Sequence, residues 1–320
     1  MNNAFTGNFR VSIMEMIAQK RALGYTYKSE ERWLVKFDQF TMANYPEETT
    51  LTYELAVAWG TIRPNEQISS FQKRLCPIRE LGRYIIRAGY DAYVLPTDYA
   101  GPERKDYVPR IYTDRELMDI FHAADQIPYS KRYPTRHLVV PVILRTVYCC
   151  GLRPSEPLKI KVCDVDLDVG QLTIRSSKGH KDRVVMLADD LLALCKKYHE
   201  RIRYIFPGSE YFFPNQSGGQ YSMRFFDEAF LRLKKKVGLQ CTSERNARIY
   251  DLRHTFVTNR IYAWLLEGKD LNSMLPYLSA YLGHATYAET AYYFHLVPEY
   301  FNQNGLNIDS YSSVIPEVAP

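Results

Sequence analysis

Apolar residues recur at helical spacing through the first ninety residues, and no strand pattern interrupts them. Gly24 is expected to end the first helix, and Ser29 is expected to cap the second. A short third helix is predicted over residues 52–59 and a longer fourth helix over residues 67–88, with Pro77 as a kink. These elements predict an N-terminal helical bundle. The apolar faces of its first two helices are formed by Phe9, Ile13, Met16 and Ile17, and by Trp33, Leu34, Phe37 and Phe40.

The pattern changes between residues 96 and 111, where prolines, a glycine and mixed charges follow no period. We predict that this segment is a linker and that the first domain comprises residues 1–95. The second domain opens at Thr113, which forms the capping-box pattern of a helix start with Glu116. We assign this domain to residues 112–300.

The hydrophobic period shortens to two at residues 172–174 and 184–187, which predicts two short strands joined through Gly179. This hairpin is the only β-structure expected. Helical patterns surround it at residues 138–150, 189–205, 223–237, 252–267 and 275–282, and around the tyrosine pair at 292–293. The predicted fold class is therefore mainly α: a helical bundle followed by a mostly helical domain with a small antiparallel β-sheet.

Composition places the chain among soluble globular proteins. Its 320 residues are enough for two domains, and 46% hydrophobic with 24% charged residues is not a disordered composition. No apolar run reaches the roughly 18 residues of a membrane span, and no secretion signal opens the chain. A cytoplasmic protein without a membrane partner is expected. The six cysteines lack the spacing of a zinc site and are predicted to be reduced core thiols.

The charge balance permits a polyanionic partner. The net charge is +5 and the sequence pI is near 8.7. Basic residues cluster at 178–183 and again at 232–236, on either side of the candidate motifs, which favours nucleic acid. Basic residues of the first domain can hold phosphates or can lie on a solvated face, and the sequence leaves both readings open. These residues are Lys20, Arg21, Lys73, Arg74, Arg79, Arg83 and Arg87.

Short motifs in the second domain carry the functional signal. They read GLRPSE at residues 151–156, IYDLRHTF at 249–256, LGHAT at 282–286 and AYYFH at 291–295. These motifs resemble those of the tyrosine recombinase, or phage integrase, family, and the resemblance covers roughly residues 5–300. It implies that the helical bundle is a core-binding, SAM-like domain that closes over DNA. It also implies that the second domain is the catalytic domain.

Two arginines provide the fixed charge that phosphodiester cleavage needs. Without a metal, the reaction requires a nucleophile, cations on the phosphate oxygens and a proton for the leaving oxygen. Arg153 and Arg253 suit the second role, because a guanidinium is always charged and donates to two oxygens. Arg153 is expected at a helix start, where an anion is favoured. Asp164, Asp166 and Asp168 are predicted to be turn or surface carboxylates, so neither a metal nor a cofactor is expected.

The resemblance assigns further roles. It implies that Lys178, at the turn of the predicted hairpin, is the general acid that protonates the leaving 5′ oxygen, with Lys181 as a competing candidate. His284 follows Gly283 at an expected helix start, and its ring is available to hydrogen-bond a phosphate oxygen.

Three tyrosines near His284 compete as the nucleophile: Tyr287, Tyr292 and Tyr293. Neighbouring helical residues point about 100° apart, so only one of the pair at 292–293 can face the site. The spacing from His284 matches the family for Tyr293, and Tyr292 is then a packing residue.

One position departs from the family pattern. A histidine usually stands three residues before the second arginine, and here that residue is Tyr250. A phenol can donate a hydrogen bond to a phosphate oxygen, but it is a poor proton shuttle near pH 7. His254 follows Arg253 directly, is expected to face elsewhere on the helix, and is interpreted as structural.

The resemblance implies a site-specific recombinase, the integrase or transposase of a mobile element, that makes a 3′-phosphotyrosyl link. Its partners are double-stranded DNA at specific sites, three further copies in a tetramer on two sites, and an accessory or excision factor. Residues 301–320 are either a frayed terminus or a segment that docks on a neighbouring subunit. The alternatives are a relaxing enzyme like a type IB topoisomerase and a catalytically silent DNA-binding protein.

Overall fold

The computed structural model describes residues 5–101, 109–175, 182–239 and 247–293. The chain divides into two compact units, residues 1–107 and 108–320, and each is described by itself. In this described part of the chain, no helix is both long enough and apolar enough to cross a membrane.

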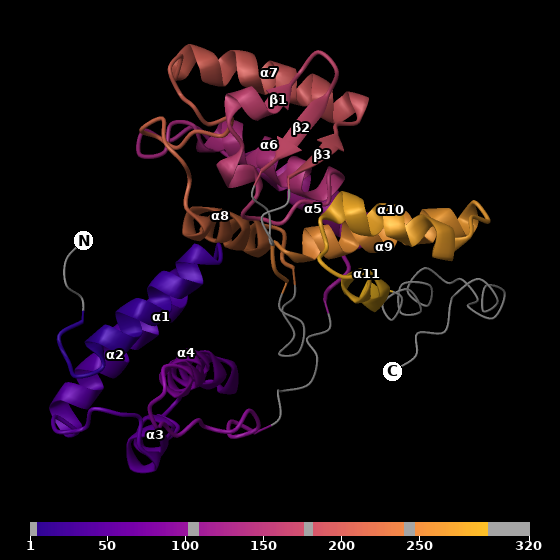
Figure 1. Cartoon of the computed structure of the whole chain (residues 1–320). Coiled ribbons are helices and arrows are strands. Elements are labelled where there is room, and N and C mark those ends of the chain that lie inside the picture. The colour runs from indigo at the N-terminus through magenta and orange to yellow at the C-terminus, as the bar shows by residue number, and fades with distance from the viewer. Residues whose placement is uncertain (1–4, 102–108, 176–181, 240–246, 294–320) are drawn as a thin grey trace. The chain divides into compact units, whose positions relative to one another are not determined.

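The first unit contains only helices among its described residues (Figure 1): α1 (Arg10–Ala22), α2 (Lys28–Asn44), α3 (Tyr53–Trp59) and α4 (Ile68–Arg87). Its core is organised around aromatic rings. The ring of Phe37 lies 5.5 Å from Phe9 and 5.3 Å from Trp59, in edge-on contacts. The prediction of an all-α N-terminal unit is confirmed.

The start of α2 differs from the prediction. The helix begins at Lys28, after Tyr27 in the left-handed conformation with φ of 50°, and no side chain caps it. Ser29 lies inside the first turn and bonds to the carboxylate of Glu30. The prediction that Ser29 caps the helix is therefore wrong.

Two basic residues of the first unit have a structural role. The sequence allowed them to bind phosphate or to lie on a solvated face, and neither is the case. Arg74 is fully buried and pairs with Glu66 at 2.6 Å, and it also donates to the carbonyl of Trp59. Arg79 is 9% exposed and donates to the carbonyl of Leu95 at 3.0 Å. Both guanidiniums donate hydrogen bonds to backbone carbonyls, so neither is available to bind a phosphate.

The second unit is mostly helical with one small sheet (Figure 1). Its sheet is antiparallel in the order β1-β2-β3, and Leu172 pairs with Val185 in the central register. The predicted hairpin is confirmed as β2 and β3. The added strand β1 was missed because two residues are too few to show a period. The elements are α5 (Asp114–Asp125), α6 (Arg136–Cys149), η1 (Pro157–Lys159), η2 (Val162–Asp164), β1 (Val165–Asp166), β2 (Gln171–Ile174), β3 (Arg183–Met186), α7 (Asp189–Ile205), α8 (Met223–Lys236), α9 (Asp251–Leu266), α10 (Leu271–Leu282) and α11 (Ala288–Ala291).

Helix α6 lies at the centre of this unit, because it packs against α5, α7 and α9. The capping box predicted at Thr113 and Glu116 starts α5 and is confirmed. Gly151, with φ of 57°, ends α6, and a Cβ added there would lie 2.4 Å from the ring of Phe256 on α9. Only glycine combines this conformation with so close an approach. The chain that leaves α6 is therefore held against α9.

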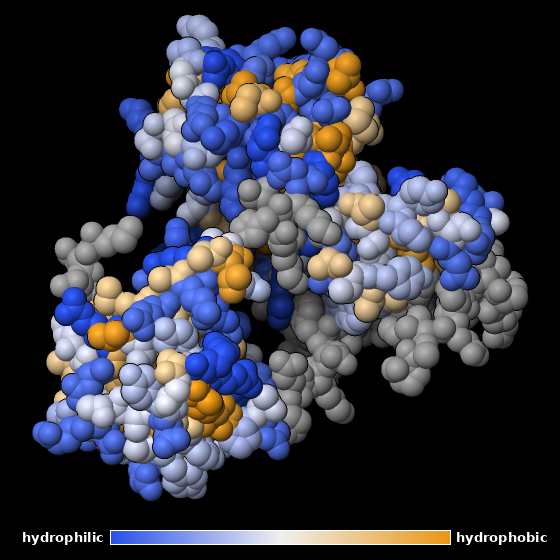
Figure 2. All heavy atoms as spheres, in the orientation of Figure 1, coloured by the Kyte–Doolittle hydropathy of each residue, from blue (hydrophilic) through white to orange (hydrophobic). Residues whose placement is uncertain are grey.

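Helices α9 and α10 lie side by side and share a core of their own (Figure 1). Leucines and aromatic residues form this core, and Tyr293 belongs to it. Gly283, with φ of 64°, ends α10 as a left-handed cap. The Gly283–His284 pair therefore lies at a helix end and not at the predicted helix start. The visible face of each unit is mostly hydrophilic, with hydrophobic residues in scattered groups (Figure 2).

Five of the six cysteines are described, and all five are free thiols. Cys150 and Cys195 are buried as predicted, whereas Cys76 and Cys163 are exposed, which corrects the prediction of core thiols at those two positions. Cys241 lies outside the described residues.

Candidate active site

Arg153 lies in the turn that follows α6, held by two elements. Its Nη2 donates to the carbonyl of Gly283 at 3.0 Å, and its Nη1 bonds to the Glu156 carboxylate at 3.0 Å. The backbone N–H of Arg153 donates to the same carboxylate at 2.8 Å. No α-helix begins here, because only the short η1 follows. The prediction of a helix-start anion site at Arg153 is wrong, and the side chain alone provides the positive charge.

Arg253, in the first turn of α9, is fully buried. It donates to the carbonyl of Gly151 at 2.8 Å and to that of Leu282 at 2.9 Å. Among the described residues, no carboxylate forms an ion pair with it, and its Nε has no hydrogen-bond partner. Burial lowers the pKa of Arg253, yet a guanidinium keeps its charge at neutral pH. A buried cation with only neutral partners is costly unless an anion joins it.

Glu156 holds two of the arginines in place. Arg183 on β3 binds it through both terminal nitrogens, at 2.9 and 2.7 Å, and Arg153 shares the same carboxylate. Burial of Glu156 opposes its ionisation, but the hydrogen bonds and charge of Arg183 outweigh burial and lower its pKa. With Arg253 nearby, the cluster contains three guanidiniums, those of Arg153, Arg183 and Arg253, and one carboxylate. It therefore carries an excess of positive charge. The sequence placed Arg183 in the basic cluster at 178–183 that favours nucleic acid, whereas in the structure it holds Glu156 in place.

His284 links α10 to Arg253 and is neutral at pH 7. Its Nε2 lies 3.0 Å from the Nη2 of Arg253 and its Nδ1 lies 2.7 Å from the Thr290 hydroxyl. Because arginine only donates, Nε2 accepts, and in the neutral ring the proton is on Nδ1. Burial, followed by the charge of Arg253, lowers the pKa of His284 to about 4. A bound phosphate anion would favour protonation of Nε2 and allow it to donate.

Tyr293 is 3% exposed, and its ring lies 6.3 Å from that of His284. Its hydroxyl is 2.9 Å from the Nδ1 of His254. His254, which the sequence suggested was a structural residue facing elsewhere, therefore contacts the candidate nucleophile. Arg253 and His254 do point in different directions, but the chain after α11 brings Tyr293 to the side of α9 where His254 lies.

The other sequence-predicted residues are placed as follows. Tyr250 is 38% exposed, and its ring lies 5.1 Å from that of His254. Tyr292 packs against the core of α9 and α10, and Tyr287 is exposed. Lys178, with its competitor Lys181, lies outside the described residues.

The aspartates before the sheet have structural partners. Asp164 is a turn carboxylate, as predicted: it accepts from the backbone N–H of Lys161 at 3.2 Å in η2, and it is buried and binds Arg175. Asp166 accepts hydrogen bonds from the backbone N–H groups of Asp168 at 2.9 Å and Val169 at 3.1 Å, as a turn carboxylate does. The described residues contain no group of three or more side chains placed to hold a metal ion.

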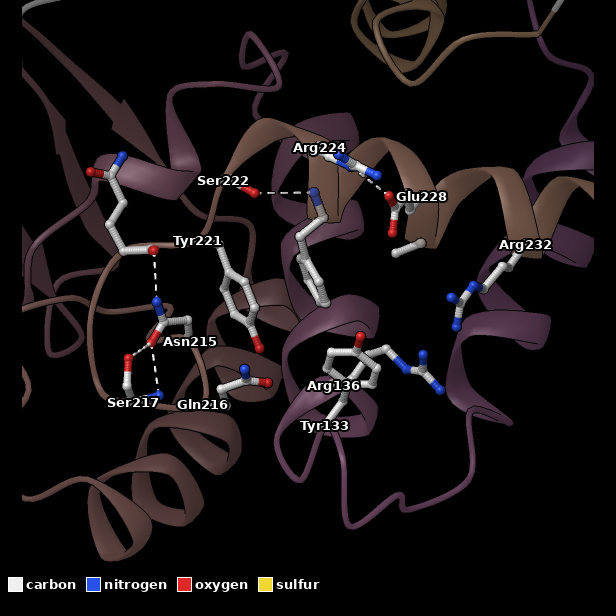
Figure 3. A pocket seen from close by; sticks show the side chains of 13 residues that line it. Tyr133, Arg136, Asn215, Gln216, Ser217, Tyr221, Ser222, Arg224, Glu228 and Arg232 are labelled. Carbon is white, nitrogen blue, oxygen red and sulfur yellow. Dashed lines mark hydrogen bonds and ion pairs between the residues drawn. The ribbon is translucent and has the colours of Figure 1, made fainter.

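Two hollows flank helix α8. One, of about 500 Å³, is mostly apolar and reaches Arg153 and Tyr250. The other, of about 330 Å³, is more polar and is lined by three arginines, Arg136, Arg224 and Arg232 (Figure 3). Glu228 pairs with Arg224 at 2.8 Å, while Arg136 and Arg232 point toward the same space. We call this second hollow the arginine pocket.

Comparison with known proteins agrees with this geometry. A family model described as the phage integrase family matches residues 110–299. The provisionally named integrase/recombinase y4rB of Sinorhizobium fredii is 32% identical over 302 residues, which cover 91% of this chain and 94% of that protein. Tyrosine recombinase XerC of Agrobacterium fabrum is 27% identical over 224 residues, covering 70% of this chain and 66% of that protein.

Solved structures share the fold. XerH recombinase bound to a palindromic difH substrate, after cleavage, matches with a TM-score of 0.63 and 19% identity, over 87% of this chain and 78% of that one. A lambda integrase tetramer bound to a Holliday junction matches with a TM-score of 0.57 and 17% identity, over 87% of this chain and 77% of that one. The resemblance inferred from the sequence is thus confirmed, and the chain belongs to the phage integrase family of tyrosine recombinases.

Proposed function

We propose that the chain is a site-specific DNA recombinase that cuts and rejoins DNA through a 3′-phosphotyrosyl intermediate, integrating or excising a mobile element. The observation that carries this proposal is the buried guanidinium of Arg253, whose partners are neutral and which lies beside the hydroxyl-bearing core residue Tyr293. Such a cation is stabilised when a phosphate anion enters.

Binding of the scissile phosphate uses the residues gathered at the end of α10. Arg153 and Arg253 donate to the non-bridging oxygens, and their positions are fixed because both also donate to carbonyls at the end of α10, those of Gly283 and Leu282. His284 becomes a third donor once its Nε2 is protonated. Tyr250, partly exposed beside the site, donates through its phenol. Fixed donors stabilise the charge that develops on phosphorus oxygens in the transition state.

The chemical steps conserve the bond energy of the DNA. The Tyr293 oxygen attacks phosphorus and the bond to the 5′ oxygen breaks, with Lys178 giving that oxygen a proton. Attack by the 5′ hydroxyl of a partner strand reverses the step and releases Tyr293. No nucleotide cofactor or metal is needed, because the cations and the proton donor come from the chain.

Strand exchange between two duplexes uses four copies on two paired sites. The lambda integrase structure, a tetramer on a Holliday junction, supports this assembly by analogy of fold. In this proposal residues 1–95 form a DNA-binding domain, residues 96–111 link it to a catalytic domain over residues 112–300, and residues 301–320 dock on a neighbouring copy. An accessory DNA-bending or excision factor joins the complex, which works on DNA in the bacterial nucleoid.

The arginine pocket supplies DNA contacts outside the reacting centre. Arg136 and Arg232 point into one space beside α8, and an arginine fork suits a phosphate or the edge of a guanine (Figure 3). The same helix lines the hollow that reaches Arg153 and Tyr250. DNA held at the reacting centre therefore passes close to α8.

Substitution of the tyrosines tests the proposal. The substrate is a nicked duplex made from the ends of the element that encodes the chain, on which cleavage releases a short strand and traps the covalent link. Tyr293→Phe keeps DNA binding, measured by gel shift, and forms no denaturant-resistant complex. The matched control, Tyr292→Phe, forms the complex. Covalent complex formation by Tyr293→Phe would overturn the assignment.

A further inference from the structure

We infer that His254 is a catalytic residue, which holds the Tyr293 hydroxyl in place and accepts its proton during attack on the phosphate. The inference rests on the proposed function. Its basis is geometric: Nδ1 of His254 lies 2.9 Å from the Tyr293 hydroxyl, and the Tyr293 ring is buried while His254 is half-buried beside it.

A simpler reading is that His254 only satisfies a buried hydroxyl, as buried phenols require. The surroundings favour the catalytic reading. Of the groups around this hydroxyl, Arg253 has no lone pair to offer, and the Nε2 of His284 already accepts from Arg253. The other ring nitrogen of His284 bonds to Thr290. Among the described residues that surround the phenol, His254 is thus the proton acceptor in direct contact with it.

The ionisation states fit this role. Burial, the charges of Arg253 and His284, and that of Arg248 lower the pKa of His254 to about 4, so its ring is neutral at pH 7 with a lone pair available. Burial raises the pKa of Tyr293, and the charge of Arg253 offsets only part of the increase. The phenol therefore does not ionise unaided at neutral pH, and attack requires a base that touches it.

Tyr250 cannot take this role. It lies one helical turn before His254 on the same face of α9, with the two rings 5.1 Å apart. A neutral phenol is a weak base and a poor proton acceptor at neutral pH. The histidine that faces the nucleophile on this helix is at 254, not at 250.

The step balances as follows. The O–H bond of Tyr293 breaks and its proton moves to Nδ1 of His254, which becomes an imidazolium. The Tyr293 oxygen forms a bond to phosphorus, and the bond from phosphorus to the 5′ oxygen breaks. Lys178 protonates the 5′ oxygen, as in the proposed function. When the strand rejoins, the attacking 5′ hydroxyl gives its proton back to Lys178 and the imidazolium returns its proton to the departing phenolate, so no proton acceptor from outside is consumed.

The test measures single-turnover formation of the covalent complex by the full chain on the nicked duplex, across about pH 6 to 10, up to the pKa of a free tyrosine. His254→Asn places an amide oxygen near the position of Nδ1, so it keeps a hydrogen-bond acceptor but takes up no proton. His254→Leu removes both properties. Gel shifts and thermal melts on each variant report DNA binding and folding.

A second substrate separates the two proton transfers. Replacing the bridging 5′ oxygen with sulfur gives a leaving group that needs no proton. We expect His254→Asn to slow complex formation about 10²-fold or more on both substrates. We also expect its rate to rise with pH, as hydroxide replaces the missing base. Lys178→Ala, by contrast, should be slow on the oxygen substrate and recover on the sulfur substrate.

Other results would overturn the inference. A wild-type rate for His254→Asn would show that no proton passes to His254, and so would a loss that does not change with pH. Recovery of His254→Asn on the sulfur substrate would place His254 on the leaving-group side. In each of these cases the proposed function stands, because wild-type protein still forms the link at Tyr293; a link that forms without Tyr293 would instead overturn the proposed function itself.

Discussion

At the scale of single residues, the site is a set of side chains whose partners are mostly neutral. Arg253 bonds to two carbonyls and to His284, and Tyr293 bonds to His254. In the proposed function, each of these groups gains a stronger partner when a phosphate diester arrives. Preorganised donors of this kind act on the transition state without the cost of reorientation.

The contributions of Tyr250 and Arg253 should differ in size. Arg253→Ala removes a buried, fixed cation and is expected to slow covalent complex formation by about 10³-fold. Tyr250→Phe removes one hydroxyl from a partly exposed ring and should slow it by about tenfold or less. Single-turnover rates on the nicked duplex compare the two. A larger loss for Tyr250→Phe than for Arg253→Ala would show that the phenol does more than donate one hydrogen bond.

At the scale of elements, the site depends on how the turn after α6 is fixed. Glu156 joins Arg153 in that turn to Arg183 on β3, so one carboxylate couples a helix end to the sheet. Gly151 lets the same turn approach α9 closely. These two features set the distance between the two halves of the phosphate site.

Loss of the Glu156 charge should destabilise the fold. Glu156→Gln leaves Arg183, whose side chain is 7% exposed, without a carboxylate. Breaking one side of a buried ion pair costs about 3–5 kcal/mol. Denaturant titration measures the change in free energy of unfolding. The control is Glu228→Gln, which breaks the exposed pair with Arg224 and is expected to leave the free energy of unfolding nearly unchanged; equal losses for the two variants would contradict the role given to Glu156.

The arginine pocket on α8 should contribute to DNA affinity through charge. Arg136→Ala and Arg232→Ala are each expected to weaken binding and to reduce the slope of log affinity against log salt by about one. Fluorescence anisotropy at several salt concentrations measures both quantities. Lys197→Ala, at an exposed position of α7 outside the pocket, is the control and should keep the wild-type slope. Unchanged slopes for both arginine variants would remove the pocket from the DNA interface.

At the scale of the whole molecule, the half-buried histidines His254 and His284 make stability depend on pH. The pKa values of His254 and His284 are both lowered to about 4, so between pH 6.5 and 4 the unfolded chain binds more protons than the folded chain. Stability is therefore full above about pH 6.5 and falls as the pH drops toward 4, by on the order of 1–3 kcal/mol per histidine.

Thermal melts from pH 7 to 4.5 measure this loss, and His254→Asn should reduce the slope because it removes one of the two groups. A slope unchanged in His254→Asn would mean that His254 is not buried in its neutral form.

Much of this molecule could be predicted from its sequence. Helix α7 was predicted to the residue at Asp189–Ile205, because its apolar face has an unbroken period. The capping box at Thr113 was predicted from local chemistry alone. The motif residues Arg253, His284 and Tyr293 were identified because their types and spacing are rare together.

The features that the sequence did not predict depend on tertiary contacts. His254 was dismissed from its angle on α9, but its role depends on where the distant Tyr293 enters the fold. Arg74 and Arg79 looked like surface cations, yet backbone carbonyls of neighbouring segments bury them. The local hydrophobic pattern does not predict such partners, because they come from loops whose paths it does not determine.

The central claim is that Tyr293 forms a covalent link to DNA without a metal. The most direct measurement mixes the protein with nicked duplexes from the ends of its element in EDTA, isolates the denaturant-resistant complex and maps the modified residue by mass spectrometry. The account predicts a complex in which the nucleotide adduct is on Tyr293. A complex that maps to Tyr287 or Tyr292, or DNA binding without any covalent complex on several candidate ends, would contradict it.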